Sequence, residues 1–235
     1  MPMRHANVDP IFENRIDAGR QLALHLHEFG GADAVVLGIP NGGMAVALAV
    51  ALPLKADLDL VISRKIPLPL SPEGGFGSIT DDGTMILNED LVKKTGLTQQ
   101  QIDYQVGQVR KDIRARSLLY RKDKRPISLG GRTVILVDDG LASGYTMRAA
   151  IASVKNRKPA RVVVAVPVGP ENVIEELEKL GNKVVTCAVG TEKVFYVSDY
   201  YRSWYDVSDE DVLTYLKEWR MRRYPTNMDT PKREF

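Results

Sequence analysis

The sequence predicts an α/β fold in which a parallel five-stranded sheet forms the core and helices flank it. Short apolar segments typical of fully buried strands recur along the chain, and helical patterns separate them. Strands that alternate with helices favour a parallel sheet with right-handed crossovers. Two of the segments end in glycine-bearing corners that open helices, as expected at the carboxyl edge of such a sheet. The five predicted strands are 34–39, 57–63, 134–137, 161–166 and 183–189.

The composition is that of a globular protein with one domain. The chain has 235 residues, of which 44% are hydrophobic and 26% are charged, and this length can bury a sizeable core. We expect a single domain over residues 1–220. Within it, residues 66–88 form a flexible loop and hairpin insertion, and residues 190–220 form a C-terminal hood segment. Residues 221–235 are expected to be a disordered tail.

The amino-acid composition and the net charge also indicate the cell compartment and restrict the possible binding partners. The longest apolar run, 44–54, is too short to span a bilayer, so no membrane is expected. The single cysteine, Cys187, and the lack of a basic and apolar leader favour the cytoplasm. The net charge is only +2. Basic residues gather late in the predicted helix 98–121, where the helix dipole favours cations, and we interpret them as solvated rather than as a nucleic-acid site.

The first elements of the chain are a helix, a strand and a second helix. Asp9 and Pro10 suit the start of the first helix, as cap and first helical residue, and Gly30 and Gly31 suit its end. The strand 34–39 then runs into Pro40, Asn41, Gly42 and Gly43, followed by a helical pattern. An anion can approach the backbone at such a corner. A glycine pair is also common in ordinary strand-to-helix turns, so this signal is weak alone.

The second predicted strand, 57–63, ends in the cations Arg64 and Lys65. These side chains could face a bound anion or could solvate a sheet edge, and we favour the first interpretation. Residues 67–77 contain prolines and glycines and predict a mobile excursion. Two short strand-like runs then flank Asp81, Asp82 and Gly83, which is a strong hairpin signal. Asn88 caps a short helix, and the long helix 98–121 follows.

The central segment runs from the strand 134–137 through Asp138 and Asp139 into a helical pattern. The backbone N–H groups of residues 142–146 would be unpaired at the start of a helix and would suit a phosphate. The hydroxyls of Ser143 and Thr146 can add donors. Two adjacent carboxylates suit a sugar diol, a metal ion or metal-bound water. The alternative is an ordinary turn with solvated acids.

This central segment resembles the ribose-phosphate signature of the type I phosphoribosyltransferases, which use 5-phosphoribosyl 1-pyrophosphate (PRPP). Asp138 and Asp139 match the two acids that hold the ribose hydroxyls. Gly140 departs from the usual aliphatic residue, which should loosen the loop. The phrase from Phe12 to Ala23 also resembles one subgroup of predicted phosphoribosyltransferases that has no assigned acceptor. The residues that match the loop around the 5-phosphate are Ala142, Ser143, Gly144, Tyr145 and Thr146.

The same resemblance assigns the pyrophosphate end of PRPP to Pro40, Asn41, Gly42, Gly43 and Arg64. Related sequences tend to carry arginine at Asn41, and losing that cation removes a charge-assisted hydrogen bond worth about 1.5–3 kcal/mol. Lys65 joins Asp138 and Asp139 as a candidate catalytic residue. The insertion at 66–88 would be a lid that excludes water from a carbocation-like sugar.

The resemblance further implies a Mg²⁺-dependent transfer of phosphoribose to a nucleobase-like acceptor, with release of pyrophosphate, by a homodimer. Asp138 and Asp139 would bind the metal directly or through water. Enzymes of the family that act on 6-oxopurines carry aspartate at the position of Ala142, so such acceptors are disfavoured. One of the hood residues could stack on a base, or all of them could pack on the sheet. These residues are Phe195, Tyr196 and Tyr200.

Two alternatives remain open from the sequence. A regulator that binds PRPP or a nucleotide without turnover would be compatible with the departures at Asn41 and Gly140. A receiver-like or generic nucleotide-binding domain would explain an acid pair after a strand, but it would leave the loop at 142–146 without a purpose. No Walker-type or dinucleotide glycine fingerprint occurs in the chain.

Overall fold

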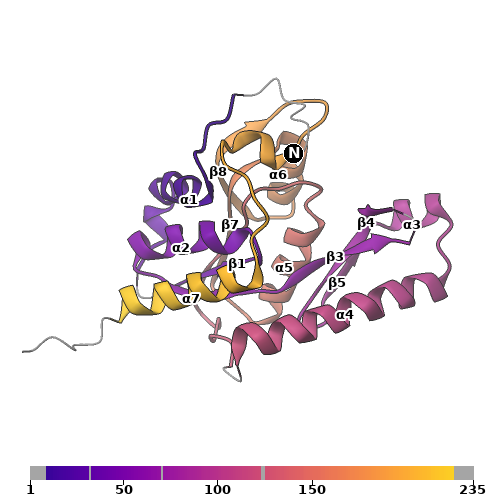
Figure 1. Cartoon of the computed structure of the whole chain (residues 1–235), viewed down its shortest axis with the longest axis horizontal. Coiled ribbons are helices and arrows are strands. Elements are labelled where there is room, and N and C mark those ends of the chain that lie inside the picture. The colour runs from indigo at the N-terminus through magenta and orange to yellow at the C-terminus, as the bar shows by residue number, and fades with distance from the viewer. Residues whose placement is uncertain (1–8, 32, 70, 123–124, 225–235) are drawn as a thin grey trace, which may run out of the picture.

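The structure is a computed structural model that describes residues 9–31, 33–69, 71–122 and 125–224. Its core is a five-stranded sheet with strand order β2-β1-β6-β7-β8 (Figure 1). Neighbouring strands in this sheet pair in parallel, which confirms the predicted fold class. The strands are β1 Ala34–Gly38, β2 Asp57–Leu60, β6 Thr133–Val137, β7 Arg161–Pro170 and β8 Lys183–Gly190.

Helices cover both faces of this sheet because alternate strand residues point to opposite sides. On β1, Val36 belongs to the cluster that includes buried side chains of α1, α2 and α7. Its neighbour Val35 belongs to a second cluster with side chains of α5 and α6. Each face is therefore closed by apolar packing. The helices are α1 Arg15–Leu24, α2 Gly43–Leu54, α5 Tyr145–Asn156, α6 Glu171–Lys179 and α7 Asp209–Arg223.

Between β2 and β6 the chain builds an arm that extends away from the five-stranded sheet (Figure 1). The predicted hairpin is present, with β4 and β5 pairing antiparallel and Gly83 at φ +88° in the turn. Asn88 caps the shorter helix of the arm, as predicted, and Thr98 caps the longer one. The elements of the arm are β3 Ser63–Leu68, β4 Ser71–Thr80, β5 Met85–Leu87, α3 Glu89–Thr95 and α4 Gln99–Arg121.

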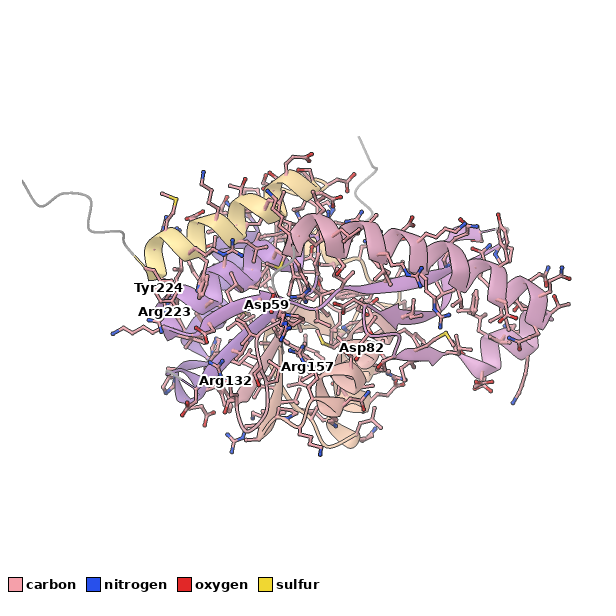
Figure 2. All side chains as sticks on the ribbon, turned by 90° about the horizontal axis from the view of Figure 1, so that it is seen from below. Asp59, Asp82, Arg132, Arg157, Arg223 and Tyr224 are labelled. Atoms are coloured by element: carbon pink, nitrogen blue, oxygen red, sulfur yellow. The ribbon has the colours of Figure 1, made fainter. Side chains whose placement is uncertain are left out.

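Charged side chains fasten the arm to the body of the protein. Arg121, at the end of α4, forms an ion pair with Asp59 of β2 (3.1 Å between Nη1 and Oδ1). At the hairpin turn, Asp82 accepts a hydrogen bond of 2.8 Å from the Ser153 hydroxyl of α5. Figure 2 labels Asp59 and Asp82 in this junction. The prediction that the basic residues of this helix are all solvated is therefore wrong for Arg121, and also for Arg116, which pairs with Asp209.

The first helix starts later than the sequence suggests. Its N-cap is Asn14, whose side chain accepts from the Asp17 amide, and not Asp9. The reason is that the preceding segment is extended: the amides of Ile11 and Phe12 both donate to the Tyr200 carbonyl, at 3.1 and 3.0 Å. The helix also ends at Leu24, and a short 3-10 helix, η1 His27–Phe29, leads to the glycines.

The predicted strand 57–63 divides between two sheets. β2 ends at Leu60, and Ser63 begins β3, which pairs with β4 from Ser63↔Thr80 to Leu68↔Ser71. The segment 67–77, expected to be a mobile excursion, thus lies largely in two paired strands. The antiparallel partner supplies hydrogen bonds that single-segment patterns do not reveal. Pro67 marks an irregularity in the register.

The C-terminal segment contains a second 3-10 helix, η2 Val197–Tyr200, and then α7. We expected a disordered tail from residue 221, but α7 continues to Arg223. The remainder of that predicted tail, 225–235, lies outside the described residues. Among the described helices, none combines the length and the apolar character needed to cross a bilayer.

Candidate functional site

Two of the predicted loops meet where the strand order of the sheet reverses. The first loop, 40–43, follows β1, and the second, 138–146, follows β6. β2 lies on one side of β1 and β6 lies on the other, so the carboxyl ends of β1 and β6 form the crevice in which such sheets bind ligands. Here the glycines of the first loop allow a close backbone approach. A Cβ atom at Gly43 would lie 2.9 Å from Cα of Asp138, and one at Gly42 would overlap the Asp139 carboxylate.

The loop after β6 leads directly into α5 and borders a cavity of about 420 Å³. Gly144 caps the helix in the left-handed region, at φ +77°. The Arg148 amide donates to the Gly144 carbonyl at 2.9 Å, and the N–H groups of the turn before it have no partner within the helix. They and the helix dipole favour an anion at this end. All five residues predicted around the 5-phosphate line this cavity: Ala142, Ser143, Gly144, Tyr145 and Thr146.

A second cavity, of about 430 Å³, lies on the side of the first loop. Asp138, Lys65 and Thr146 line both cavities, so the two adjoin at these residues. Apart from these three residues, the second cavity is lined by residues 39 and 40, where the first loop begins, and by residues of the arm. These residues include Pro40, Arg64, Val109 and Asp112.

Asp138 and Asp139 point to different environments, although we expected both to face a ligand. Only Asp138 is among the residues that line the two cavities. Burial, followed by the neighbouring Asp139 carboxylate, raises the pKa of Asp138 well above its usual value. Asp139 instead forms an ion pair with Arg15 of α1 (2.7 Å between Oδ2 and Nε). Its backbone carbonyl accepts a hydrogen bond of 2.6 Å from the Tyr201 hydroxyl.

Arg15 is a residue of this site that the sequence did not single out. Its side chain is 6% exposed. The guanidinium carbon lies 3.7 Å from the ring centroid of Trp204, and Nη1 donates to the Tyr205 carbonyl at 2.8 Å. Arg15 therefore ties the C-terminal segment and α1 to the acidic corner. The available signal was the phrase from Phe12 to Ala23, which contains Arg15 but does not identify Asp139 as its partner.

The Asn41 side chain does not line either cavity. It is held between α4 and the start of α7, where its oxygen accepts a hydrogen bond of 2.6 Å from Arg116 Nη1 and its nitrogen donates to Asp209 at 2.9 Å. We expected a loop without a cation, and the structure places Arg116 beside it. Burial and then the charge of Arg116 lower the pKa of Arg64, which lines the second cavity.

Lys65 extends from β3 over a glycine of β4. A Cβ atom at Gly75 would overlap Cγ of Lys65 and would lie 2.6 Å from Cδ. Gly75 also lines the first cavity. The arm thus contributes both a cation and the glycine that leaves room for its stem. Whether the arm closes as a lid stays a prediction.

The predicted hood residues lie elsewhere. Among the described residues that line the two cavities, none is Phe195, Tyr196 or Tyr200. The Phe195 and Tyr200 rings pack together, 5.4 Å apart, and the Tyr200 hydroxyl donates to Glu192 at 3.0 Å. Burial and then this carboxylate raise the pKa of Tyr200 to about 12. These contacts favour packing over base stacking for Phe195 and Tyr200.

Gly140 leaves room for a side chain that packs against the acidic corner. A Cβ atom at this position would overlap the side chain of Val197. Glycine is therefore needed for close packing of η2 against the acidic corner. The departure from the aliphatic pattern has its explanation in a segment more than 50 residues away in the sequence.

The part of the chain that the structure describes holds no group of three or more His, Cys, Asp and Glu side chains suited to a metal ion.

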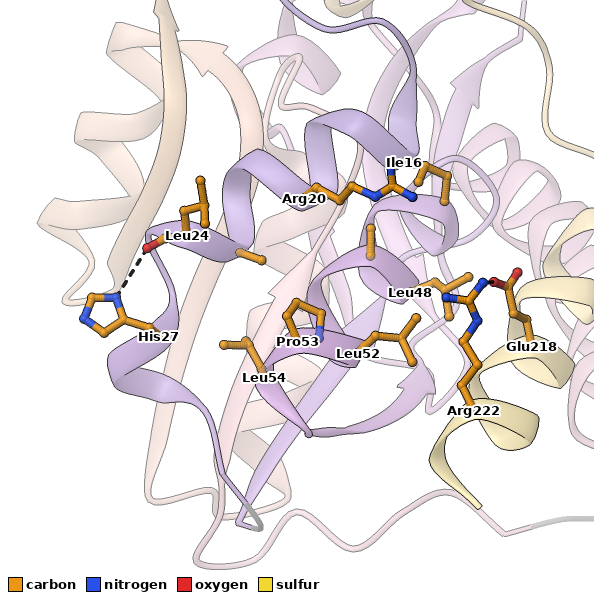
Figure 3. A pocket seen from close by; sticks show the side chains of 12 residues that line it. Ile16, Arg20, Leu24, His27, Leu48, Leu52, Pro53, Leu54, Glu218 and Arg222 are labelled. Atoms are coloured by element: carbon orange, nitrogen blue, oxygen red, sulfur yellow. Dashed lines mark hydrogen bonds and ion pairs between the residues drawn. The ribbon is translucent and has the colours of Figure 1, made fainter. Parts of the chain in front are cut away.

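A third cavity, of about 530 Å³, lies between α1, α2 and α7 (Figure 3). It is largely apolar and shares no lining residue with the two cavities at the loops. At its edge Arg222 pairs with Glu218 at 2.7 Å.

The chain is similar in sequence and fold to known proteins. A sequence model described as the phosphoribosyl transferase domain matches residues 7–202. Two curated proteins of Mycobacterium tuberculosis (strains CDC 1551 / Oshkosh and ATCC 25618 / H37Rv) are 37% identical over 206 residues, and their names assign them provisionally as phosphoribosyl transferases. The match covers 88% of this chain and 46% of theirs, so the chain spans about half the length of these relatives.

A solved structure is similar over nearly its whole length. The crystal structure of TT1426 from Thermus thermophilus has a TM-score of 0.72 and 37% identity to this chain. The match covers 88% of this chain and 98% of that one. The five-stranded sheet with its flanking helices is therefore shared with an experimentally determined relative.

Proposed function

The chain belongs to the phosphoribosyl transferase family, and from this premise we propose that it transfers the 5-phosphoribosyl group of PRPP to a nitrogenous acceptor. The acceptor nitrogen would form a bond to C1 of the ribose as the bond from C1 to pyrophosphate breaks. One observation carries the proposal: Asp138 lies at the junction of two cavities, one at a helix N-terminus and one beside Arg64 and Lys65. A sugar that is phosphorylated at both ends fits this arrangement.

Each part of the site has a separate task in this proposal. The amides and hydroxyls of residues 142–146 bind the 5-phosphate, because the start of α5 favours an anion. The Asp138 carboxylate accepts hydrogen bonds from the ribose diol and stabilises the positive charge that develops on the sugar. Arg64, Lys65 and the loop at 40–43 hold the pyrophosphate as it leaves. Binding both reactants in register supplies much of the rate enhancement.

The residues present fit a Mg²⁺ ion. Mg²⁺ is usually bound through one or two carboxylates together with substrate phosphates and water, rather than by a cage of protein ligands. Asp138 lines both cavities and is the carboxylate placed for this task, whereas Asp139 is held by Arg15. When bound, the ion would neutralise negative charge on the pyrophosphate.

We propose an acceptor other than a 6-oxopurine. Ala142 lies on the loop where family members that act on such purines carry an aspartate, and a methyl group cannot accept a proton or a hydrogen bond. By analogy with the family we also propose a homodimer, which sedimentation of the purified chain would test. The cytoplasm remains the proposed location.

The proposed function is tested by pyrophosphate release. The purified chain is incubated with Mg²⁺ and PRPP, and a panel of nucleobases and amines is added one at a time. Release that depends on one acceptor supports the transferase. Binding of PRPP in titration calorimetry without release across the panel would instead support the regulator. A chain that binds neither PRPP nor pyrophosphate would contradict both.

A substitution at Gly75 should weaken PRPP binding through Lys65. Gly75→Ala places a methyl group against the Lys65 stem and should displace its ammonium from the cavities. We expect up to about 10-fold weaker binding, which corresponds to about 1.4 kcal/mol. Titration calorimetry measures it. Gly107→Ala is the control, because nothing lies within 4 Å of the added carbon in α4. Equal affinities in both variants would contradict a role for Lys65.

A further inference from the structure

A cluster of polar side chains connects the loop at 40–43 to two distant helices. Oδ1 of Asp209, at the start of α7, accepts three hydrogen bonds. The donors are Nη1 of Arg116 at 2.6 Å, the Tyr120 hydroxyl at 2.5 Å and Nδ2 of Asn41 at 2.9 Å. Arg116 and Tyr120 lie one turn apart on α4 and are themselves hydrogen-bonded at 2.9 Å. Three segments that are far apart in the sequence therefore meet at one carboxylate oxygen.

Asn41 is the point at which this cluster holds the loop. Its amide oxygen accepts from Arg116 Nη1 at 2.6 Å, and its amide nitrogen donates both to Asp209 and to the Val207 carbonyl, at 2.9 Å in each case. Both ends of the amide are thus used. Pro40, the preceding residue, lines the second cavity. The orientation of Asn41 consequently fixes the backbone that borders this cavity.

Hydrogen bonds within the cluster lower the pKa of the Asp209 carboxyl and so favour its charged form. Burial alone would raise the pKa of Asp209, but the hydrogen bonds from Tyr120 and Asn41, and the charge of Arg116, lower it overall. Burial and then the bond to Asp209 raise the pKa of Tyr120 to about 12, so its hydroxyl stays a donor.

The cluster contributes less to stability than its number of contacts suggests. The Arg116 and Asp209 side chains are 23% and 30% exposed, and ion pairs in contact with solvent are screened. The hydrogen bonds of the cluster, in contrast, bind both ends of the Asn41 amide and so act on the loop at 40–43. The Asn41 side chain is also the position at which a cation was expected from the resemblance, and Arg116 brings one within 2.6 Å of it.

We propose that Arg116, Tyr120 and Asp209 are positioning residues for the pyrophosphate end of PRPP. They hold Asn41, and with it the loop at 40–43, in the conformation that receives the pyrophosphate, and Arg116 supplies positive charge where Asn41 has none. This inference rests on the proposed function. It assigns a binding task to α4 and to the start of α7, which lie outside the two loops that follow β1 and β6.

The test compares ligands that use different ends of the site. Arg116→Met and Asp209→Asn remove opposite charges from the cluster, and Arg116→Lys keeps the charge but not the planar fork. Binding of PRPP, inorganic pyrophosphate and ribose 5-phosphate is measured by titration calorimetry with Mg²⁺ present. We expect each of the first two variants to bind PRPP and pyrophosphate about 10-fold more weakly, and ribose 5-phosphate within about twofold of the natural chain. Arg116→Lys should recover part of the loss.

Arg114→Met is the matched control, because Arg114 is an exposed cation on the same helix. It should bind all three ligands as the natural chain does. If Arg116→Met and Asp209→Asn keep full affinity for pyrophosphate while the natural chain binds it, the inference is overturned and the proposed function stands. An equal loss for ribose 5-phosphate would show general damage to the site and would also overturn it. If the natural chain binds neither PRPP nor pyrophosphate, the proposed function fails and the inference fails with it.

Discussion

Asp138→Asn is expected to weaken PRPP binding by about 10- to 100-fold, because charge-assisted hydrogen bonds to a carboxylate contribute about 1.5–3 kcal/mol. Asp138 lines both cavities, so its carboxylate is placed between the two phosphorylated ends of the proposed ligand. An amide of the same shape would keep one hydrogen-bond acceptor. It would lose the negative charge that stabilises the positive charge developing on the sugar. Pyrophosphate release should fall at least as much as binding. Titration calorimetry and the release assay measure the two effects.

The same substitution should not destabilise the fold at neutral pH. The pKa of Asp138 is raised by burial and by Asp139, so the folded state binds its proton more tightly than the unfolded state does. Ionised Asp138 therefore opposes folding above its folded-state pKa, and this effect disappears as the pH falls below the unfolded-state value. Asp138→Asn should be as stable as the natural chain or more stable at pH 7, and the difference should vanish in acid. Denaturant titrations at several pH values check this.

The two readouts together separate a site residue from a structural one. A variant that unfolds at neutral pH would show that Asp138 supports the fold. A variant with unchanged affinity for PRPP would remove the carboxylate from the proposed mechanism. Only weaker binding in a folded protein agrees with a carboxylate that has been retained for function at some expense in stability.

The sequence predicted those parts of the fold that local patterns encode. β1, β6 and β7 each contain a continuous apolar run, and alternate residues of such a run, as Val35 and Val36 show, pack on opposite faces. The turn at Asp81 to Gly83 and the cap at Asn88 depend on residues within a few positions of one another, and they were also found.

What the sequence missed depends on contacts between distant segments. Phe12 looked helical, but its amide pairs with the Tyr200 carbonyl, and nothing near residue 12 encodes that partner. Gly140 departs from the aliphatic residue of the signature. The side chain of Val197 occupies the space that a side chain at this position would need. Asn41 looked like a lost cation, but Arg116 on α4 lies beside it.

The two acids illustrate the same limit within the site. Their adjacency in the sequence suggested a shared task, and a turn residue next to a strand end can point either way. The structure directs Asp138 to the cavities and Asp139 to Arg15. The partner of Asp139 is a guanidinium more than 100 residues away in the sequence, and a local motif carries no information about it.

Removal of Arg15 is expected to have the largest effect on stability. Arg15→Met would leave the Asp139 carboxylate, 18% exposed in the pair, without its counter-charge, and breaking such a pair from one side costs about 3–5 kcal/mol. The contact with the Trp204 ring would be lost as well. For a chain of this size the melting temperature should fall by roughly 6–20 °C. Urea unfolding and calorimetry measure the change.

Two further variants show whether this loss comes from the unpaired acid. Adding Asp139→Asn to Arg15→Met removes the orphaned charge and should restore part of the stability, which a double-mutant cycle quantifies. Arg202→Met is the control, because the pair between Arg202 and Glu13 lies at the surface, 63% and 65% exposed, and such pairs contribute about 0–1 kcal/mol. If Arg15→Met were no more destabilising than Arg202→Met, Asp139 would not depend on Arg15, and its carboxylate would be available to join Asp138 at the ligand.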